Sequence, residues 1–122
     1  MNFVFLLMLL GLLVHEVDAY FKREWRLLYF LRSMKEDVAR PIFMNLHIPL
    51  VAAIVWSAYW APTSIVDSTR VGLSAFAIVH AILHMRLRKH PLYEFDGRSH
   101  WIIGSTAALG AVYLLLAATD RA

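Results

Sequence analysis

Histidine and acidic residues interrupt the apolar stretches of this 122-residue chain. Five of its six histidines lie within or beside such stretches, at His15, His47, His80, His84 and His100. An ionisable side chain inside an apolar segment costs free energy, and such residues usually mark a functional site. Imidazole and carboxylate groups bind zinc, iron, copper and manganese. The residue types therefore predict a metal site.

Four apolar windows must position these side chains. The chain is 60% hydrophobic and 17% charged, whereas soluble domains average roughly 45–50% apolar and about 25% charged residues. The windows cover about residues 2–20, 41–60, 71–87 and 101–119, and a membrane-spanning helix needs about 17–25 such residues. We therefore predict an all-α integral membrane four-helix bundle, a single domain over residues 1–122 in contact with the lipid bilayer. The chain has no cysteine, which excludes disulfides, thiolate metal sites and c-type haem attachment.

The basic residues predict the orientation of the bundle. Ten of the twelve lysines and arginines lie between spans one and two or between spans three and four. The positive-inside rule places those connections in the cytoplasm and both termini outside. This sidedness accounts for the formal charge of +3, so we predict no nucleic-acid partner. Val17–Ala19 resembles a signal-peptide cleavage site, but no basic residue precedes the apolar run. We expect the first span to be retained.

The candidate ligands fall into two layers of depth. His15, His47 and His80 each lie six or seven residues inside the nearest basic residue, which is about 9–10 Å at 1.5 Å per residue. A shallower layer, two to four residues inside, consists of Asp18, His84 and His100. All four spans contribute, and we predict that these six residues are the metal ligands.

Helical spacing indicates which candidates share a face. His15 and Asp18 are three residues apart, and His80 and His84 are four apart, so each pair points the same way. Glu16 lies about 100° away from His15 around the helix and is expected to support the site. The candidate general bases are Glu16, Glu94 and Asp96.

The connections and the last span also allow predictions. We expect residues 21–34 to continue span one as an interfacial helix, with Trp25 and Tyr29 at the level of the lipid headgroups. Asp96 or Ser99 is expected to cap span four. Span four carries small residues at Gly104, Ala108 and Ala111. Because small residues let helices approach closely, we expect a helix contact there.

Several short motifs together resemble a known group of proteins. The sequence "HEVDA" followed by "EW", and then "LHIPL", "HAILH" and "HPLYEF", resembles an uncharacterised family of small bacterial four-span membrane proteins. It is also similar to the HXXEE domain, which is thought to chelate metal. On this resemblance His15 matches the histidine and Asp18 the first acid, while Ala19 stands where the second acid would be. The resemblance implies metal binding in the bacterial inner membrane, and the missing acid argues against a two-metal site.

Three kinds of function are compatible with these residues. The first is a metal-dependent enzyme acting on a lipidic or small hydrophobic substrate, using zinc for hydrolysis or iron for oxidation. The second is a small b-type cytochrome that carries electrons, with His47 and His80 as axial haem ligands. The third is a non-catalytic accessory membrane subunit or metal carrier, and the protein could act as a homo-oligomer or with a partner membrane subunit.

Overall fold

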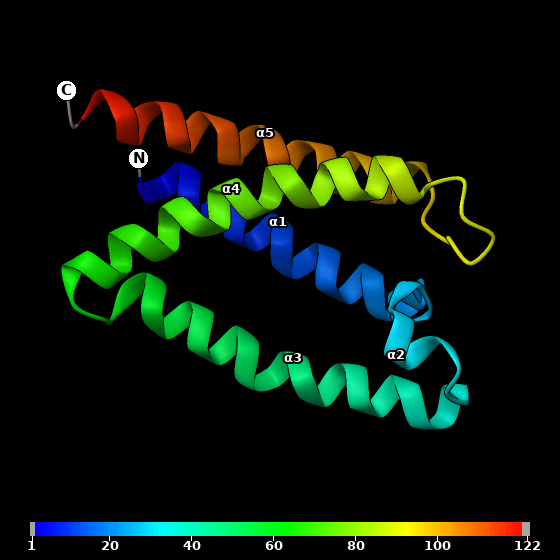
Figure 1. Cartoon of the computed structure of the whole chain (residues 1–122). Coiled ribbons are helices and arrows are strands. Elements are labelled where there is room, and N and C mark those ends of the chain that lie inside the picture. Colours follow the sequence, from blue (N-terminus) through cyan, green and yellow to red (C-terminus); the bar gives the residue numbers. More distant parts are fainter. Residues whose placement is uncertain (1, 121–122) are drawn as a thin grey trace.

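The chain folds into helices joined by turns, as a computed structural model describes for residues 2–120 (Figure 1). The elements are α1 (Asn2–Phe21), the 3-10 turn η1 (Glu24–Leu27), α2 (Tyr29–Arg32), α3 (Glu36–Tyr59), α4 (Thr63–Leu87) and α5 (Gly97–Thr119). Helices α1, α3, α4 and α5 are long and apolar enough to cross a membrane. The prediction of an all-α chain with four candidate spans is thus confirmed. Helix α4 is longer than its window, because it begins at Thr63.

The four long helices alternate in direction and differ in how closely they pack. Helices α1 and α4 both pack closely on α5, whereas α3 packs mainly on α4 and diverges from α1 (Figure 1). The start of α1, the end of α5 and the α3–α4 turn lie at one end of the bundle, here called the terminal end. The segment 22–35 and the α4–α5 loop, residues 88–96, lie at the other end, here called the loop end.

Two glycines permit the close packing of α1, α4 and α5. A Cβ atom on Gly110 of α5 would lie 2.7 Å from the backbone oxygen of Ser74 on α4, and one on Gly11 of α1 would overlap Thr106 of α5. The backbones can approach this closely only because no side chain intervenes. Gly104 and Ala108, which we predicted at such a contact, are instead exposed. That prediction was wrong, because the buried face of α5 carries Gly110.

Each end of the bundle has its own apolar core. The terminal-end core includes Phe5, Met8, Ala58, Ala77 and Tyr113, from all four long helices. The loop-end core consists of Ala19, Trp25, Leu31, Ala39, Phe43 and Phe95. Large apolar side chains also cover the outside of the bundle, among them Phe3, Val17, Ile48, Val79 and Leu115. An apolar exterior on all four long helices is what a surrounding bilayer requires.

The segment after α1 turns back instead of continuing the helix. Helix α1 ends at Phe21, and Arg23 adopts a left-handed conformation with φ of 53°. The predicted interfacial helix over residues 21–34 was therefore wrong. Trp25 is 1% exposed and packs against Phe43 of α3, with ring centroids 5.8 Å apart, whereas Tyr29 is 89% exposed. Burial of a large aromatic side chain favours the reversal, which inserts η1 and α2 beside α3.

The start of α5 carries the predicted cap. The Asp96 carboxylate accepts hydrogen bonds from the backbone N–H groups of Arg98 and Ser99, at 3.0 and 3.1 Å. The Ser99 hydroxyl in turn accepts from the backbone N–H of Asp96 at 3.3 Å. This reciprocal pair is a capping box, so Asp96 and Ser99 act together.

Candidate metal centre

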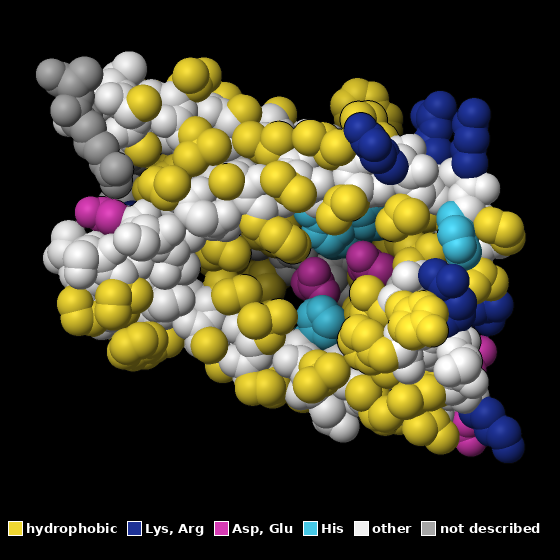
Figure 2. All heavy atoms as spheres, in the orientation of Figure 1, with side chains coloured by type: hydrophobic (Ala, Val, Ile, Leu, Met, Phe, Trp, Pro, Cys, Tyr) yellow, Lys and Arg dark blue, Asp and Glu magenta, His cyan; other side chains and the backbone are white. Residues whose placement is uncertain are grey.

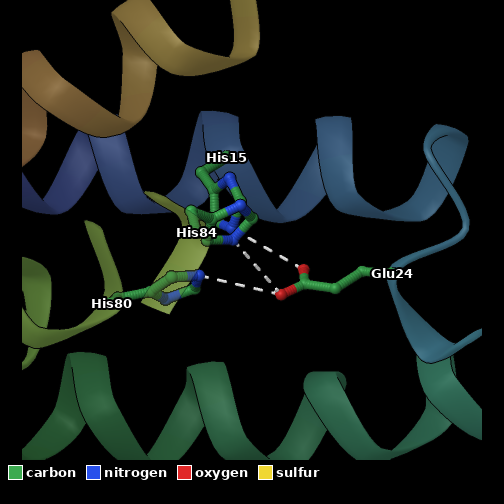
Figure 3. Close-up of side chains that lie close together, drawn as sticks. All are labelled: His15, Glu24, His80 and His84. Carbon is green, nitrogen blue, oxygen red and sulfur yellow. Dashed lines mark ion pairs between the residues drawn. The ribbon is translucent and has the colours of Figure 1, made fainter. Parts of the chain in front are cut away.

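Four side chains converge between the two apolar cores. His15 of α1, His80 and His84 of α4, and Glu24 of η1 each offer one ligand atom, and these atoms lie within 4.8 Å of one another (Figure 3). The Nε2 atoms of the three histidines lie 3.6, 3.7 and 3.5 Å from the Glu24 carboxylate oxygens. Two ligands about 2.0–2.1 Å from a tetrahedral ion are about 3.3–3.4 Å apart. The separations fit a single ion after small side-chain shifts.

His15 is the most deeply buried member of this His15/Glu24/His80/His84 cluster. It is 2% exposed, and neither ring nitrogen has a hydrogen-bond partner. Its ring stacks on Phe95 and meets His80 edge-on, with centroids 4.6 Å apart in the second pair. An imidazole buried without partners costs free energy. An ion held by Nε2 would remove part of that cost, so the residues present fit a metal.

Glu24 reaches the cluster because its neighbours on both sides are fixed. On one side, Arg23 Nε and Nη2 donate to the two oxygens of Glu94 in the α4–α5 loop, at 2.8 and 2.6 Å. On the other side, Trp25 is buried in the loop-end core. A bidentate arginine–carboxylate pair fixes orientation as well as position. The left-handed turn at Arg23 therefore directs the Glu24 carboxylate into the bundle.

The histidines keep Glu24 ionised. Burial alone would raise the pKa of the Glu24 carboxyl, but its contact with His84 and the charges of His15 and His80 outweigh burial and lower the pKa below its ordinary value. A lowered pKa means that the group stays a carboxylate at neutral pH. Glu24 is thus in the form that binds cations.

The other nitrogen of His84 belongs to a hydrogen-bonded chain that leads outward. His84 Nδ1 lies 3.0 Å from the Tyr93 hydroxyl, which lies 2.8 Å from Nε2 of the exposed His100. Burial raises the pKa of Tyr93 to about 12, so its hydroxyl stays protonated. If a metal ion occupied Nε2 of His84, Nδ1–H would donate to the Tyr93 hydroxyl, and Tyr93 would donate to His100. Such a partner fixes the ring orientation of a metal-binding histidine.

A cavity of about 430 Å³ lies beside the cluster, between α1, α3 and α4. Figure 2 shows a hollow with acidic and histidine side chains gathered toward its loop end. Glu24 and His80 belong to the cluster and also line the cavity. Across the cavity Glu16 pairs with His47, with Oε2 and Nε2 2.9 Å apart. His47 Nδ1 lies 2.7 Å from the backbone oxygen of Phe43. The cluster therefore has one side open to an apolar space.

The structure brings together three of the six predicted ligands, His15, His80 and His84. Asp18, His47 and His100 lie outside the cluster. The depth estimate predicted His47 at the level of His15, but α3 stands apart from α1, and His47 contacts Glu16 instead. Asp18 has a buried Oδ2 without a hydrogen-bond partner, and His100 is reached only through Tyr93.

The candidate bases have different surroundings. Glu16 lines the cavity. We had expected it to support the site from a different face of the helix than His15. Glu94 and Asp96 are held in ion pairs at the loop end, by Arg23 and Lys22 respectively. The hydrogen bonds from these cations lower the pKa of each carboxyl. Neither lines the cavity.

Glu24 is the member of the cluster that sequence reasoning missed. It lies in "FKREW", beyond the end of the first span, and a continuing helix would have carried it away from the bundle. The only signal was an acid next to a tryptophan able to bury itself. That signal predicts the position of Glu24 only when the chain reversal at Arg23 is known.

Comparisons with known proteins locate the chain in one family. A family model described as "Family of unknown function (DUF6713)" matches residues 1–120. The match lends no support to the similarity with the HXXEE domain. No curated protein and no solved structure matched the chain. The functional argument therefore depends on the geometry of the cluster and the cavity.

Proposed function

The chain belongs to a family of unknown function (DUF6713), and we propose that it is a membrane protein that binds one divalent metal ion through His15, Glu24, His80 and His84. The observation that carries this proposal is the convergence of three imidazoles on one carboxylate at 3.5–3.7 Å, with the buried nitrogens of His15 left unpartnered. A buried cluster of ionisable groups costs free energy, and a bound cation would offset that cost by giving the unpartnered nitrogens a ligand bond.

Among the metals that histidine and carboxylate ligands bind, we propose zinc or iron. Three histidine ligands with a water in the fourth position are typical of catalytic zinc, whereas Glu24 as a fourth protein ligand would close a tetrahedral site. For the catalytic role we propose that the three histidines hold the ion and that Glu24 lies beside the open position. Iron accepts histidine and carboxylate ligands and retains open positions. A bound ion of this class would polarise a carbonyl and lower the pKa of a water beside it. We favour zinc, because hydrolysis needs only water as a second reactant.

The adjacent cavity favours an enzyme over a purely structural metal site. Glu24 and His80 belong to both the cluster and the cavity wall, so a substrate in the cavity would reach the open side of the cluster. We propose hydrolysis of an ester or amide of a lipidic acid. Water adds its oxygen to the carbonyl carbon, the bond to the leaving oxygen or nitrogen breaks, and the leaving group takes up a proton. The products are an acid and an alcohol or amine.

The predicted haem pair was His47 and His80, but both ring nitrogens of His47 already face partners, Glu16 and the Phe43 oxygen. The packing of the three cluster histidines also argues against haem between any two of them. A bis-histidine haem requires its macrocycle between the two axial rings. The His15 ring lies 4.6 Å from that of His80 and 5.0 Å from that of His84, centroid to centroid, and His80 stacks on His84. Rings in direct contact leave no room for a porphyrin. A metal ion fits this arrangement better.

We further propose that the protein lies in the bacterial inner membrane with its loop end in the cytoplasm. Support comes from the four apolar helices and from the ten of twelve basic residues gathered in or beside the loop-end connections. The metal site would then open toward the inner half of the bilayer.

Metal content and visible absorption of the purified protein test the proposal. We expect about one zinc per chain and no Soret band, and a Soret band would replace the metal proposal with the haem alternative. The variant Glu24→Gln separates two roles for Glu24. Lowered metal affinity identifies a ligand, whereas full zinc content with loss of hydrolysis identifies a general base. Asp37→Asn, an exposed acid on α3, is the control.

A further inference from the structure

The polar and apolar residues that line the cavity between α1, α3 and α4 lie at different positions along its length. Its polar residues are Glu16, Glu24, His47 and His80. The remaining lining is apolar. Leu28 and Phe43 lie on the loop-end side of the polar residues, and the rest extends toward the terminal end as far as Leu9 on α1, Val55 on α3 and Leu73 on α4. A volume of about 430 Å³ lies within the roughly 300–1,000 Å³ range of ligand sites. The lining suits a molecule with one polar end.

The length of the apolar part can be estimated from the helices. Leu9 is seven residues from Glu16, Val55 is eight from His47, and Leu73 is seven from His80. At 1.5 Å per residue these intervals are about 10–12 Å. An extended hydrocarbon chain advances about 1.25 Å per carbon when its C–C bonds are about 1.5 Å. The cavity therefore matches about eight methylene groups in a single straight chain.

The polar end indicates which head group would bind there. His47 Nδ1 has only the Phe43 carbonyl as partner, so it carries a hydrogen, and Nε2 faces the Glu16 carboxyl at 2.9 Å. Both ring nitrogens of His47 are therefore occupied by groups of the protein. The proposed divalent ion with one glutamate ligand would carry a net charge of +1. The polar end thus disfavours a cationic head and favours an oxygen acceptor.

We propose that this cavity binds one straight-chain acyl compound, its chain along the apolar wall and its carbonyl oxygen between the Glu16–His47 pair and the Glu24–His80 edge of the cluster. The position of the carbonyl rests on the proposed metal site, whereas the position of the chain depends only on the cavity. The substrate class of the proposed hydrolase is therefore a single-chain acyl ester or amide. Glu16 and His47 position the head group.

Photo-crosslinking of the whole zinc-loaded chain in phosphatidylcholine nanodiscs tests the inference. The probes are two decanoic acids, one carrying a diazirine near the methyl end and the other carrying it beside the carboxyl group. We expect the first to label the region of Leu9 and Ile54, and the second to label the region of Leu28 and Phe43, because these residues line opposite ends of the cavity. Excess unlabelled decanoic acid should compete, and decylamine should not.

Matched variants separate the cavity from the lipid-facing surface. Val51→Trp fills the cavity from α3 and should lower labelling at least fivefold. Ile48→Trp, whose native side chain is 63% exposed on the same helix, should leave labelling unchanged. Leu13→Phe narrows the cavity from α1 and replaces Val51→Trp if that variant fails to fold. Zinc content should be the same in all three.

Several outcomes would overturn the inference. One is equal labelling of outward-facing residues on all four long helices, which means that the probe only dissolves in the bilayer. Others are unchanged labelling in both cavity variants, or equal competition by decylamine. Zinc content is read separately, so the two proposals fail independently. Cavity labelling without zinc binding would remove the metal site and leave the chain site, and zinc binding without cavity labelling would do the reverse.

Discussion

Helix α3 and the three-helix unit of α1, α4 and α5 face each other across the cavity, but they are held in different ways. The three-helix unit is closely packed at Gly11 and Gly110 and carries all three histidines of the metal cluster. Helix α3 packs on α4 and is kept apart from α1 at the loop end by η1 and α2, through Trp25 and Leu31.

This difference shows why residues at one depth perform different tasks. His15 and His80 meet because their helices are both in the three-helix unit. His47, predicted at the same depth on α3, instead pairs with Glu16 at the wall of the cavity. The separation of α3 leaves the cavity open, and the packing of the other helices brings the three cluster histidines together.

The largest effect should come from removing a ligand that lies in the three-helix unit. We expect His84→Ala to lower zinc affinity by more than about 100-fold, since loss of even an outer partner of a metal ligand costs about 10–100-fold. Zinc titration against a competing chelator measures this. His90→Ala, in the α4–α5 loop and outside the cluster, is the control. Equal affinity in the two variants would show that His84 is not a ligand.

The next effect tests the close packing itself. Gly110→Ala places a methyl group 2.7 Å from the Ser74 backbone oxygen and should lower the free energy of unfolding by about 1–3 kcal/mol, as other overpacking substitutions do. Gly104→Ala, with nothing within 4 Å of its new Cβ, should be neutral or slightly stabilising. Unfolding in mild detergent, followed by circular dichroism, compares them. If Gly104→Ala proved the more damaging, the exposed face of α5 would be a contact surface.

A smaller effect is expected at the turn that joins the two regions. Arg23→Ala removes both hydrogen bonds to Glu94 and keeps the unfavourable left-handed backbone, so we expect about tenfold weaker zinc binding through misplacement of Glu24. Arg23→Gly loses the same hydrogen bonds but adopts φ of 53° readily. It should retain more affinity than Arg23→Ala. The reverse order would mean that the turn does not place Glu24.

The smallest effect on metal binding is expected on α3. His47→Leu should leave zinc content unchanged while lowering the free energy of unfolding by about 1 kcal/mol, because Glu16 loses its partner at the cavity wall. The double variant Glu16→Leu/His47→Leu removes both polar groups and should recover part of the loss. Zinc lost on His47→Leu alone would place α3 closer to the metal site than the structure does.

Much of the fold could be predicted from local sequence. The four apolar helices followed from windows of sufficient length, and the cap at Asp96 followed from its position before Ser99. Both features depend on neighbouring residues only. The buried face of α5 could not be predicted, because Gly104 and Gly110 are both small residues on an apolar helix and only the partner helices distinguish them.

The candidate site, too, could be predicted only where it depends on local properties of the sequence. Depth and helical spacing, which follow from the rise and period of a helix, indicated that His15, His80 and His84 could meet. Glu24 could not be found this way, because it depends on a chain reversal at Arg23 that is favoured by the burial of Trp25 against a helix further along the chain.

The sequence by itself determined that the chain forms four apolar helices, that its basic residues gather beside two of the connections, and that histidines lie within these helices, because hydropathy and helix geometry are local properties. Only the tertiary structure decided which of those histidines meet, that Glu24 joins them, and that Glu16 and His47 line a cavity instead. These outcomes depend on the distance between α3 and the other helices, which is set by packing between residues far apart in the chain.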